Sequence, residues 1–218
     1  MKAVIFDLDG TLINNEWIYD QAYCVVLKSL NISCDQLNHI PGIGLQENWE
    51  RMVNDLGIKK TSAELAAQTR DAYLQNINKV KLRDGARELI FDLKRKHTLA
   101  ILGTSTGKET ATQVLQQIGA EKLFDFTVFG DEVENKKPAP DIFLKAMDKA
   151  GILPRETIVI EDSAAGVEAG KAAGAKVIAI KTDWYTRDQL FRADFIADDF
   201  AHILDLIKNE KTLDHSTG

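Results

Sequence analysis

The sequence predicts an α/β protein: a Rossmann-like parallel sheet with helices on both faces, plus an inserted all-helical cap domain. Three observations lead to this prediction. Apolar runs of strand length alternate with amphipathic helical stretches over most of the chain. Another such run opens the chain, and an almost entirely helical stretch separates it from the remainder. Strands that alternate with helices are typical of a parallel sheet that is covered on both faces.

The expected strands are short apolar runs bounded by turn residues. They cover residues 3–6, 98–102, 126–129, 157–160, 175–180 and 195–197. Helical spacing of apolar residues predicts the helices that connect them. These helices cover residues 86–94, 109–118, 140–150 and 164–173. The polar end of the chain, residues 209–218, is expected to fray.

The helical stretch after the first strand is expected to form a domain of its own. Residues 14–30 have helical spacing, and the residues on or near the apolar face are Trp17, Ala22, Val25, Val26 and Leu30. A turn-rich segment, residues 39–44, is followed by helical stretches around 49–56 and over 62–76. The predicted division is a core domain of residues 1–14 and 81–218 and a helical cap domain of residues 15–80.

The composition excludes several classes of protein. With 218 residues, 44% hydrophobic and 28% charged, the chain is ordinary for a soluble globular protein. A formal net charge of −6 without a basic stripe argues against a nucleic-acid or membrane partner. The four apolar residues between Lys2 and Asp7 are too few for a signal peptide. Cys24 and Cys34 lack the spacing of a zinc site or disulfide framework, so a reduced cytoplasm is the expected location.

Polar side chains follow the strands at one edge of the predicted sheet. Ligands of open parallel sheets bind beyond the carboxyl ends of the strands. That edge gathers carboxylates, small hydroxyls and lysines, namely Asp7, Asp9, Thr104, Ser105, Lys136, Lys137, Glu161 and Asp162. Carboxylates suit a hard cation such as Mg2+, while hydroxyls, N–H groups and a lysine suit an anion. The combination is the one that phosphoryl transfer requires.

The opening motif is Asp7-Leu8-Asp9-Gly10-Thr11. Two carboxylates this close are costly without a cation between them or a shared proton. Side chains i and i+2 of a strand point the same way, but Gly10 favours a bend. Asp9 therefore offers either its side chain or its backbone carbonyl to the site that the Asp7 side chain faces. From this stretch alone, an acidic turn that caps a buried strand remains the alternative.

Together with the later motifs, this one resembles the haloacid dehalogenase-like (HAD) hydrolase superfamily. Thr104 matches the hydroxyl residue of the second motif, and Lys137 matches the lysine of the third. Glu161-Asp162-Ser163, followed by two glycines, resembles the fourth, metal-binding motif. The match runs through essentially the whole chain in order. One departure is Asn14-Asn15-Glu16, where the family often carries Asp-Ser-Glu.

The resemblance implies a Mg2+-dependent phosphomonoesterase that acts on a small phosphorylated metabolite such as a sugar phosphate. It implies Asp7 as the nucleophile, Asp9 as the general acid and base, and Thr104 and Lys137 as further catalytic residues. The phosphate-binding residues it implies are Leu8, Thr104, Ser105 and Lys137. The metal ligands it implies are Asp7, the Asp9 carbonyl and Asp162, with Glu161 supporting directly or through water. We expect a cytoplasmic monomer or weak homodimer.

The main alternative is a phosphosugar mutase of the beta-phosphoglucomutase type. In those relatives the resemblance implies a cap histidine that restrains the general acid and a cap-loop arginine that binds a distal phosphate. This chain has Tyr19 and Leu45 at the aligned positions, which favours a phosphatase. An arginine such as Arg51 or Arg70 in the closed site would weaken that choice. A catalytically silent binding protein on the same fold is a further alternative.

Overall fold

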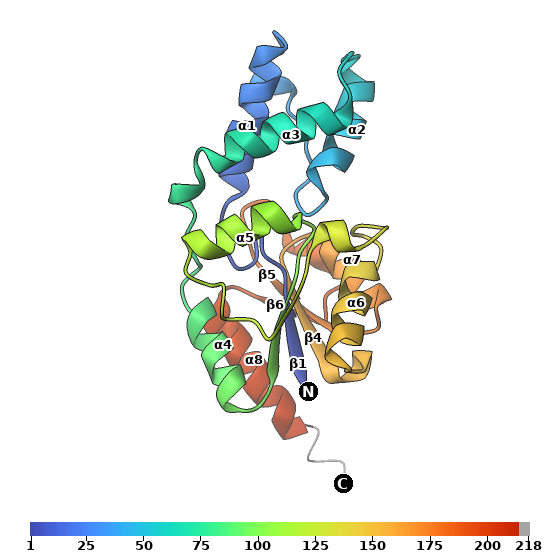
Figure 1. Ribbon diagram of the computed structural model, residues 1–218. Helices are drawn as coiled ribbons and strands as arrows, with labels where there is room; N and C mark the ends of the chain where they lie inside the picture. Colours follow the sequence, from blue (N-terminus) through green and yellow to red (C-terminus); the bar gives the residue numbers. More distant parts are fainter. Residues whose placement is uncertain (214–218) are drawn as a thin grey trace.

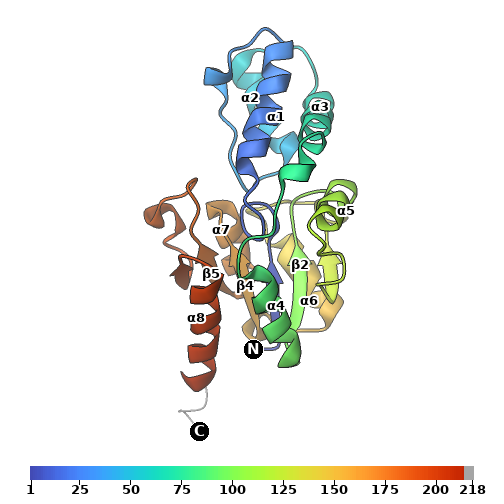
Figure 2. The same ribbon diagram turned by 90° about the vertical axis from the view of Figure 1, so that its left-hand side faces the viewer.

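The computed structural model describes residues 1–213, with side chains described through residue 209. A sheet covered by helices forms the core, and a bundle of three helices stands above one end of it (Figures 1 and 2). No helix within the described residues is both long and apolar enough to cross a bilayer.

All pairings in the six-stranded sheet are parallel. The strands are β1 (Ala3–Phe6), β2 (Leu99–Gly103), β3 (Phe126–Val128), β4 (Thr157–Glu161), β5 (Lys176–Ile180) and β6 (Phe195–Ala197). Their order in space is β3-β2-β1-β4-β5-β6, so β1 lies between β2 and β4. The chain order reverses at β1, and ligands of such sheets bind at this reversal, outside the carboxyl ends of the strands. Residues 7–9 follow β1 at this position.

Helices cover both faces of the sheet (Figure 2). One face carries α4 (Ala86–Arg95), α5 (Lys108–Gln117) and α8 (Phe200–Leu213), and the other carries α6 (Asp141–Ala150) and α7 (Ala164–Ala172). Alternate side chains of β1 point to opposite faces, so Val4 and Phe6 join one hydrophobic cluster while Ile5 joins the other. These three side chains are fully buried, which explains why the strand is a continuous apolar run.

The upper bundle consists of α1 (Glu16–Ser29), α2 (Leu45–Leu56) and α3 (Ser62–Leu74), and α3 packs against both other helices (Figure 1). Its interior is held by polar as well as apolar contacts. The indole of Trp49 is fully buried and donates a hydrogen bond to Thr69 Oγ1 at 2.8 Å. Helix α3 begins with a capping box between Thr61 and Glu64.

Two chain segments join this bundle to the sheet. They lie side by side, because Ile13 bridges to Leu82 and the backbone N–H of Arg83 donates to the Leu12 carbonyl at 2.8 Å. The predicted division, residues 1–14 and 81–218 against residues 15–80, places its boundaries in these segments. That division remains a prediction about independent domains.

The fold class predicted from the sequence is confirmed, and each expected strand is present within a residue or two of its predicted bounds. Helix α8 was not expected. It continues through residues 209–213, which were expected to fray, and residues 214–218 lie outside the described part of the chain. Short 3₁₀ turns connect other elements; they are Cys34–Gln36, Ile77–Lys79, Gly130–Glu132, Pro154–Glu156 and Arg187–Leu190.

Two expectations about α1 were wrong. Trp17 and Val25 are exposed, whereas Ala22 and Val26 are buried as expected, together with Ile18 and two tyrosines. Cys24 and Cys34 are paired as a disulfide, with Cα atoms 5.1 Å apart, although the sequence was interpreted as lacking a disulfide framework. The pair ties α1 to the following 3₁₀ turn.

Candidate active site

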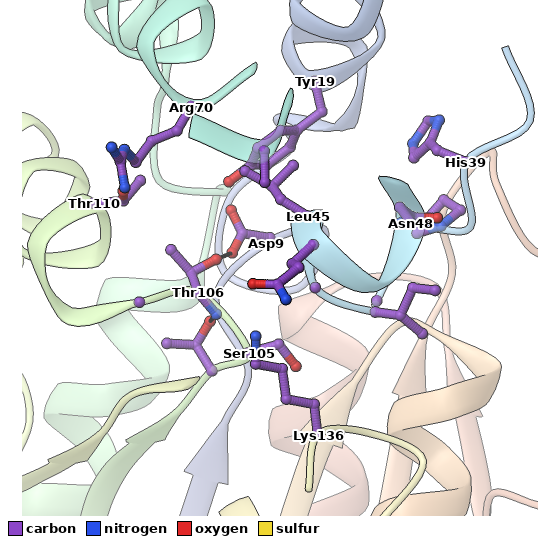
Figure 3. Close-up of a pocket in the computed structure, with 18 of the residues that line it drawn as sticks. Asp9, Tyr19, His39, Leu45, Asn48, Arg70, Ser105, Thr106, Thr110 and Lys136 are labelled. Carbon is purple, nitrogen blue, oxygen red and sulfur yellow. Dashed lines mark hydrogen bonds between the residues drawn. The ribbon is translucent and has the colours of Figure 1, made fainter. Parts of the chain in front are cut away.

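A cavity of about 320 Å³ lies between the helical bundle and the carboxyl ends of the strands. Its floor comes from the core segments that follow β1, β2 and β3, and its roof comes from α1, α3 and residues 39–46 (Figure 3). Asp7 and Asp9 both line it. The cavity therefore opens at the point of strand reversal that the fold defines.

At the floor, Lys137 bridges two carboxylates. Its Nζ lies 2.5 Å from Asp7 Oδ1 and 2.5 Å from Glu161 Oε1, and all three side chains are almost completely buried. Burial raises the pKa of Asp7 well above its ordinary value, although the Lys137 ammonium opposes the rise. Burial by itself lowers the pKa of Lys137, but the two adjacent carboxylates outweigh it and raise this pKa. A single buried ammonium thus compensates two carboxylates.

The turn from β4 into α7 fixes Glu161 and Asp162. Glu161 Oε2 accepts hydrogen bonds from the backbone N–H groups of Asp162 and Ser163, both at 2.9 Å, and from Ser163 Oγ at 3.0 Å. Asp162 Oδ1 accepts a hydrogen bond from Thr11 Oγ1 at 2.9 Å. Gly10 lets the opening motif approach this closely: its φ is +79°, and a Cβ there would lie 2.2 Å from Asp162 Oδ2.

Asp7, Glu161 and Asp162 could hold a metal ion. One oxygen from each lies within 4.8 Å of the others. Burial, followed by the neighbouring Glu161 and Asp7 charges, raises the pKa of Asp162 well above its ordinary value, and a bound cation would relieve this repulsion. Both Glu161 oxygens already accept hydrogen bonds, from Lys137 and from the turn before α7. Asp7 and Asp162 are therefore more available than Glu161 to bind a metal ion directly. Oxygen donors of this kind fit a hard divalent cation.

Asp9 faces away from this acidic cluster, toward the cap. Its Oδ1 accepts a hydrogen bond from Asn15 Nδ2 and its Oδ2 accepts one from Thr106 Oγ1, both at 2.6 Å. Asn15 also donates to the hydroxyl of Tyr73 on α3 at 2.9 Å. Burial raises the pKa of Asp9, and the hydrogen bonds from Thr106 and Asn15 partly offset that rise. The Asp9 side chain is therefore coupled to both sides of the cavity.

The loop after β2 supplies the hydroxyls expected to bind an anion. Thr104 and Ser105 both line the cavity, and Ser105 Oγ is buried without a hydrogen-bond partner in the described residues. Thr104 Oγ1 accepts a hydrogen bond from the backbone N–H of Thr106 at 3.1 Å. The side chain of Leu8 is fully buried in the hydrophobic core, so only the main chain of Leu8 is available to a phosphoryl group.

The cap residues used to choose between phosphatase and mutase do face the cavity. Tyr19 and Leu45 line it, and the Tyr19 ring stacks on Tyr73 with a centroid distance of 4.2 Å (Figure 3). Arg70 on α3 also lines it, whereas Arg51 donates to the Asn38 carbonyl at 3.5 Å, outside the cavity lining. The position of Arg70 weakens the sequence-based argument against a mutase.

Several contacts join the cap to the core beside the cavity. Lys136, one of the residues expected at this edge of the sheet, lines the cavity and pairs with Glu47 on α2 at 3.1 Å. The Tyr185 hydroxyl donates to the Pro41 carbonyl at 2.8 Å. Gly42, with a φ of +86°, approaches Ser163 so closely that a Cβ would lie 2.3 Å from its Oγ. The segment of residues 40–47 is therefore fitted against the core.

Several residues of the site were missed by sequence reasoning. They are Thr11, Asn15, Glu16, His39 and Thr106. Thr11 and Thr106 belong to segments that had been singled out, so their proximity to the carboxylates was the available signal. Asn15 and Glu16 lie in the segment that departs from the family pattern, but their roles and that of His39 depend on how the cap sits over the core.

Comparison with known proteins agrees with this fold. The family model of the haloacid dehalogenase-like hydrolases matches residues 4–180. The chain belongs to this family, and it is a phosphoric monoester hydrolase by class.

Two curated relatives and one solved structure illustrate the similarity. The phosphorylated carbohydrates phosphatase of Thermotoga maritima is 34% identical over 181 residues, which are 82% of this chain and 84% of that protein. The fructose-1-phosphate phosphatase YqaB of Escherichia coli is 28% identical over 187 residues, 82% of this chain and 96% of that protein. The structure of beta-phosphoglucomutase from Clostridium difficile matches with a TM-score of 0.85 at 22% identity, covering 100% of both chains.

Proposed function

We propose that this protein is a Mg2+-dependent phosphomonoesterase that cleaves a sugar phosphate or a related small metabolite through an aspartyl phosphate on Asp7. The observation that carries the proposal is the presence at one cavity of a buried carboxylate, Asp7, and a partly buried one, Asp9, in different surroundings. Asp7 contacts Lys137 beside the metal-capable cluster, whereas Asp9 is hydrogen-bonded away from it. The two carboxylates are thereby suited to different roles.

In the first half-reaction, an Asp7 oxygen attacks phosphorus and the bond from phosphorus to the leaving oxygen breaks. Asp9 in its protonated form donates its proton to that oxygen, so a neutral alcohol departs. The raised pKa of Asp9 favours this protonated form. Lys137, Thr104, Ser105 and the main chain of Leu8 would orient and neutralise the phosphoryl oxygens.

In the second half-reaction, Asp9 accepts a proton from water and the water oxygen attacks phosphorus. The bond from phosphorus to Asp7 breaks, which releases phosphate and restores both carboxylates to their starting protonation states. The segments packed between cap and core would exclude other water from the cavity during the first step.

The metal would be Mg2+, held by Asp7, Asp162 and the Asp9 carbonyl, with Glu161 behind them. When bound it supplies positive charge beside the phosphoryl group, which a protein of formal charge −6 otherwise lacks. The hydrogen bonds that occupy both Glu161 oxygens support an indirect role for this residue.

A phosphosugar mutase is the second candidate, and Arg70 is the observation that favours it, since a mutase must hold a bisphosphate at both ends. One experiment separates the two. Purified protein and Mg2+ are incubated with a sugar 1-phosphate, and both inorganic phosphate and sugar 6-phosphate are measured. We expect phosphate release without exchange between the isomers. Steady conversion to the 6-phosphate without phosphate release would contradict the phosphatase assignment.

A further inference from the structure

The cap side of the cavity contains buried polar groups that the proposed chemistry at Asp7 does not use. Glu16, Tyr23 and His39 all line the cavity, and their side chains are more than nine-tenths buried. Figure 3 shows His39 on the opposite side of the cavity from Arg70. The phosphate-binding floor, with Thr106 and Ser105, lies between and below these two sides.

These groups are incompletely paired. The Glu16 carboxylate lies 3.5 Å from His39 Nε2, which is longer than an ordinary hydrogen bond. Within the part of the chain that the structure describes, neither His39 Nε2 nor the Tyr23 hydroxyl has a hydrogen-bond partner, although both atoms are buried. Buried polar groups are normally hydrogen-bonded, so an unpaired set at the wall of a cavity indicates a ligand that completes it.

His39 is held firmly in this position. Its ring stacks on the Tyr23 ring with a centroid distance of 4.8 Å, and its Nδ1 lies 3.4 Å from Asp20 Oδ1. The edge of Trp184, from the core, lies against it with a centroid distance of 6.4 Å. The imidazole therefore lies between two carboxylates of α1 and can orient the Glu16 side chain toward the cavity.

We propose that Glu16, oriented by His39, binds a hydroxyl group of the substrate at a distance from the phosphate and thereby selects polyhydroxylated phosphate esters. This inference rests on the proposed phosphatase function and assigns the residues that recognise the hydroxylated part of its substrate. Glu16 is the specificity residue, and His39 is a positioning residue that acts through it. The Tyr23 hydroxyl contributes a second polar group to the same wall.

The donors and acceptors present favour a hydroxyl over a charged group. A second phosphate or a carboxylate only accepts hydrogen bonds and would meet the negative charges of Glu16 and Asp20. An ammonium group only donates and would leave any donor of His39 or Tyr23 without a partner. A hydroxyl donates to the Glu16 carboxylate and accepts from a neighbouring donor at the same time, so it can pair with both the acceptor and the donors of this wall.

The test compares two substrates with wild-type protein and variants, in the presence of Mg2+. Sorbitol 6-phosphate carries a chain of hydroxyls, whereas p-nitrophenyl phosphate carries none. For Glu16→Gln, the ratio of kcat/KM for sorbitol 6-phosphate to that for p-nitrophenyl phosphate should fall about tenfold or more, as expected for a lost hydrogen bond to a charged group. Glu16→Asp, which keeps the charge but shortens the reach, should lower the same ratio.

Two further variants sharpen the result. His39→Gln should lower the ratio less than Glu16→Gln, because it acts only through the orientation of Glu16. Glu109→Gln removes a carboxylate elsewhere on the cavity wall, and the ratio should stay within about twofold of wild type. Melting curves of all variants check that each is folded.

The possible failures are distinguishable. If wild-type protein hydrolyses neither substrate, the phosphatase function itself is wrong. If it hydrolyses both but folded Glu16→Gln and Glu16→Asp leave the ratio unchanged, the hydroxyl site is wrong and the phosphatase function stands. An equal fall of the ratio in Glu109→Gln would likewise overturn the assignment, because the effect would then be one of general cavity charge.

Discussion

The two walls of the cavity are built in different ways. On the core side, each carboxylate is tied by short direct hydrogen bonds: Asp7 and Glu161 share Lys137 at 2.5 Å, and Asp9 accepts two bonds at 2.6 Å. On the cap side, Glu16 has a histidine at 3.5 Å, and the Tyr23 hydroxyl and His39 Nε2 lack a hydrogen-bond partner in the described residues, as Ser105 Oγ does on the core side.

This difference suggests a division of labour. Groups whose geometry is fixed before substrate arrives are suited to stabilising a transition state, because they need no reorganisation during the reaction. Groups left incompletely paired are suited to recognising a ligand that supplies the missing partners. The core wall would thus carry the chemistry and the cap wall the selection.

The largest effect is expected from the nucleophile. Asp7→Asn removes the attacking oxygen with almost no change of shape, so turnover should fall by several powers of ten while the fold persists. Phosphate release and a melting curve measure the two quantities. Asp148→Asn, an exposed change on α6, is the control. A variant that keeps about a tenth or more of the wild-type rate would refute covalent catalysis by Asp7.

Removal of the metal comes next. Chelation should stop hydrolysis, and added Mg2+ should restore it and raise the melting temperature, because a cation relieves the repulsion between Asp7 and Asp162. Ca2+ should restore less activity, since its coordination is looser. Activity that is undiminished in excess chelator would show that the acidic cluster has another role.

Substitution of two adjacent lysines compares the stability that the core wall and the contact with the cap each contribute. Lys137→Met leaves two buried carboxylates without a cation and should destabilise the fold by about 3–5 kcal/mol, besides abolishing activity. Lys136→Met breaks a partly exposed pair with Glu47 and should cost only about 0–1 kcal/mol. Denaturant unfolding of both variants measures the difference. Equal losses of stability would contradict the contrast between the two walls.

The smallest predicted effect concerns the positioning of Asp9. Thr106→Val removes one hydrogen bond from the general acid and base, and kcat should fall about tenfold, part of the usual contribution of such a group. Thr110→Val alters another cavity-lining threonine, which donates no hydrogen bond to Asp9, and should change kcat far less. If the two variants lose kcat equally, Thr106 does not act through Asp9.

Sequence reasoning was strongest where local pattern decides structure. The apolar runs that become β1 and β4 end directly in Asp7 and Glu161, so the parallel sheet and its rim followed from the chain alone. It failed where tertiary contact decides. The burial of Tyr23 against Trp49, the partnership of Asn15 with Asp9, and the entry of Arg70 into the cavity all depend on how α1, α2 and α3 pack and where they sit above the sheet.

The most direct test of the account is to trap the phosphorylated enzyme. The Asp9→Asn variant should still transfer the phosphoryl group of p-nitrophenyl phosphate to Asp7, because p-nitrophenolate departs without a proton. The variant should then hydrolyse the aspartyl phosphate slowly, because an asparagine side chain at this position cannot accept a proton from water. Acid quenching followed by peptide mass spectrometry should then show a phosphoryl group on Asp7, approaching one per molecule, and none in the Asp7→Asn variant. Continued turnover by Asp9→Asn without a phosphorylated peptide, or phosphate on another residue, would contradict the proposed mechanism.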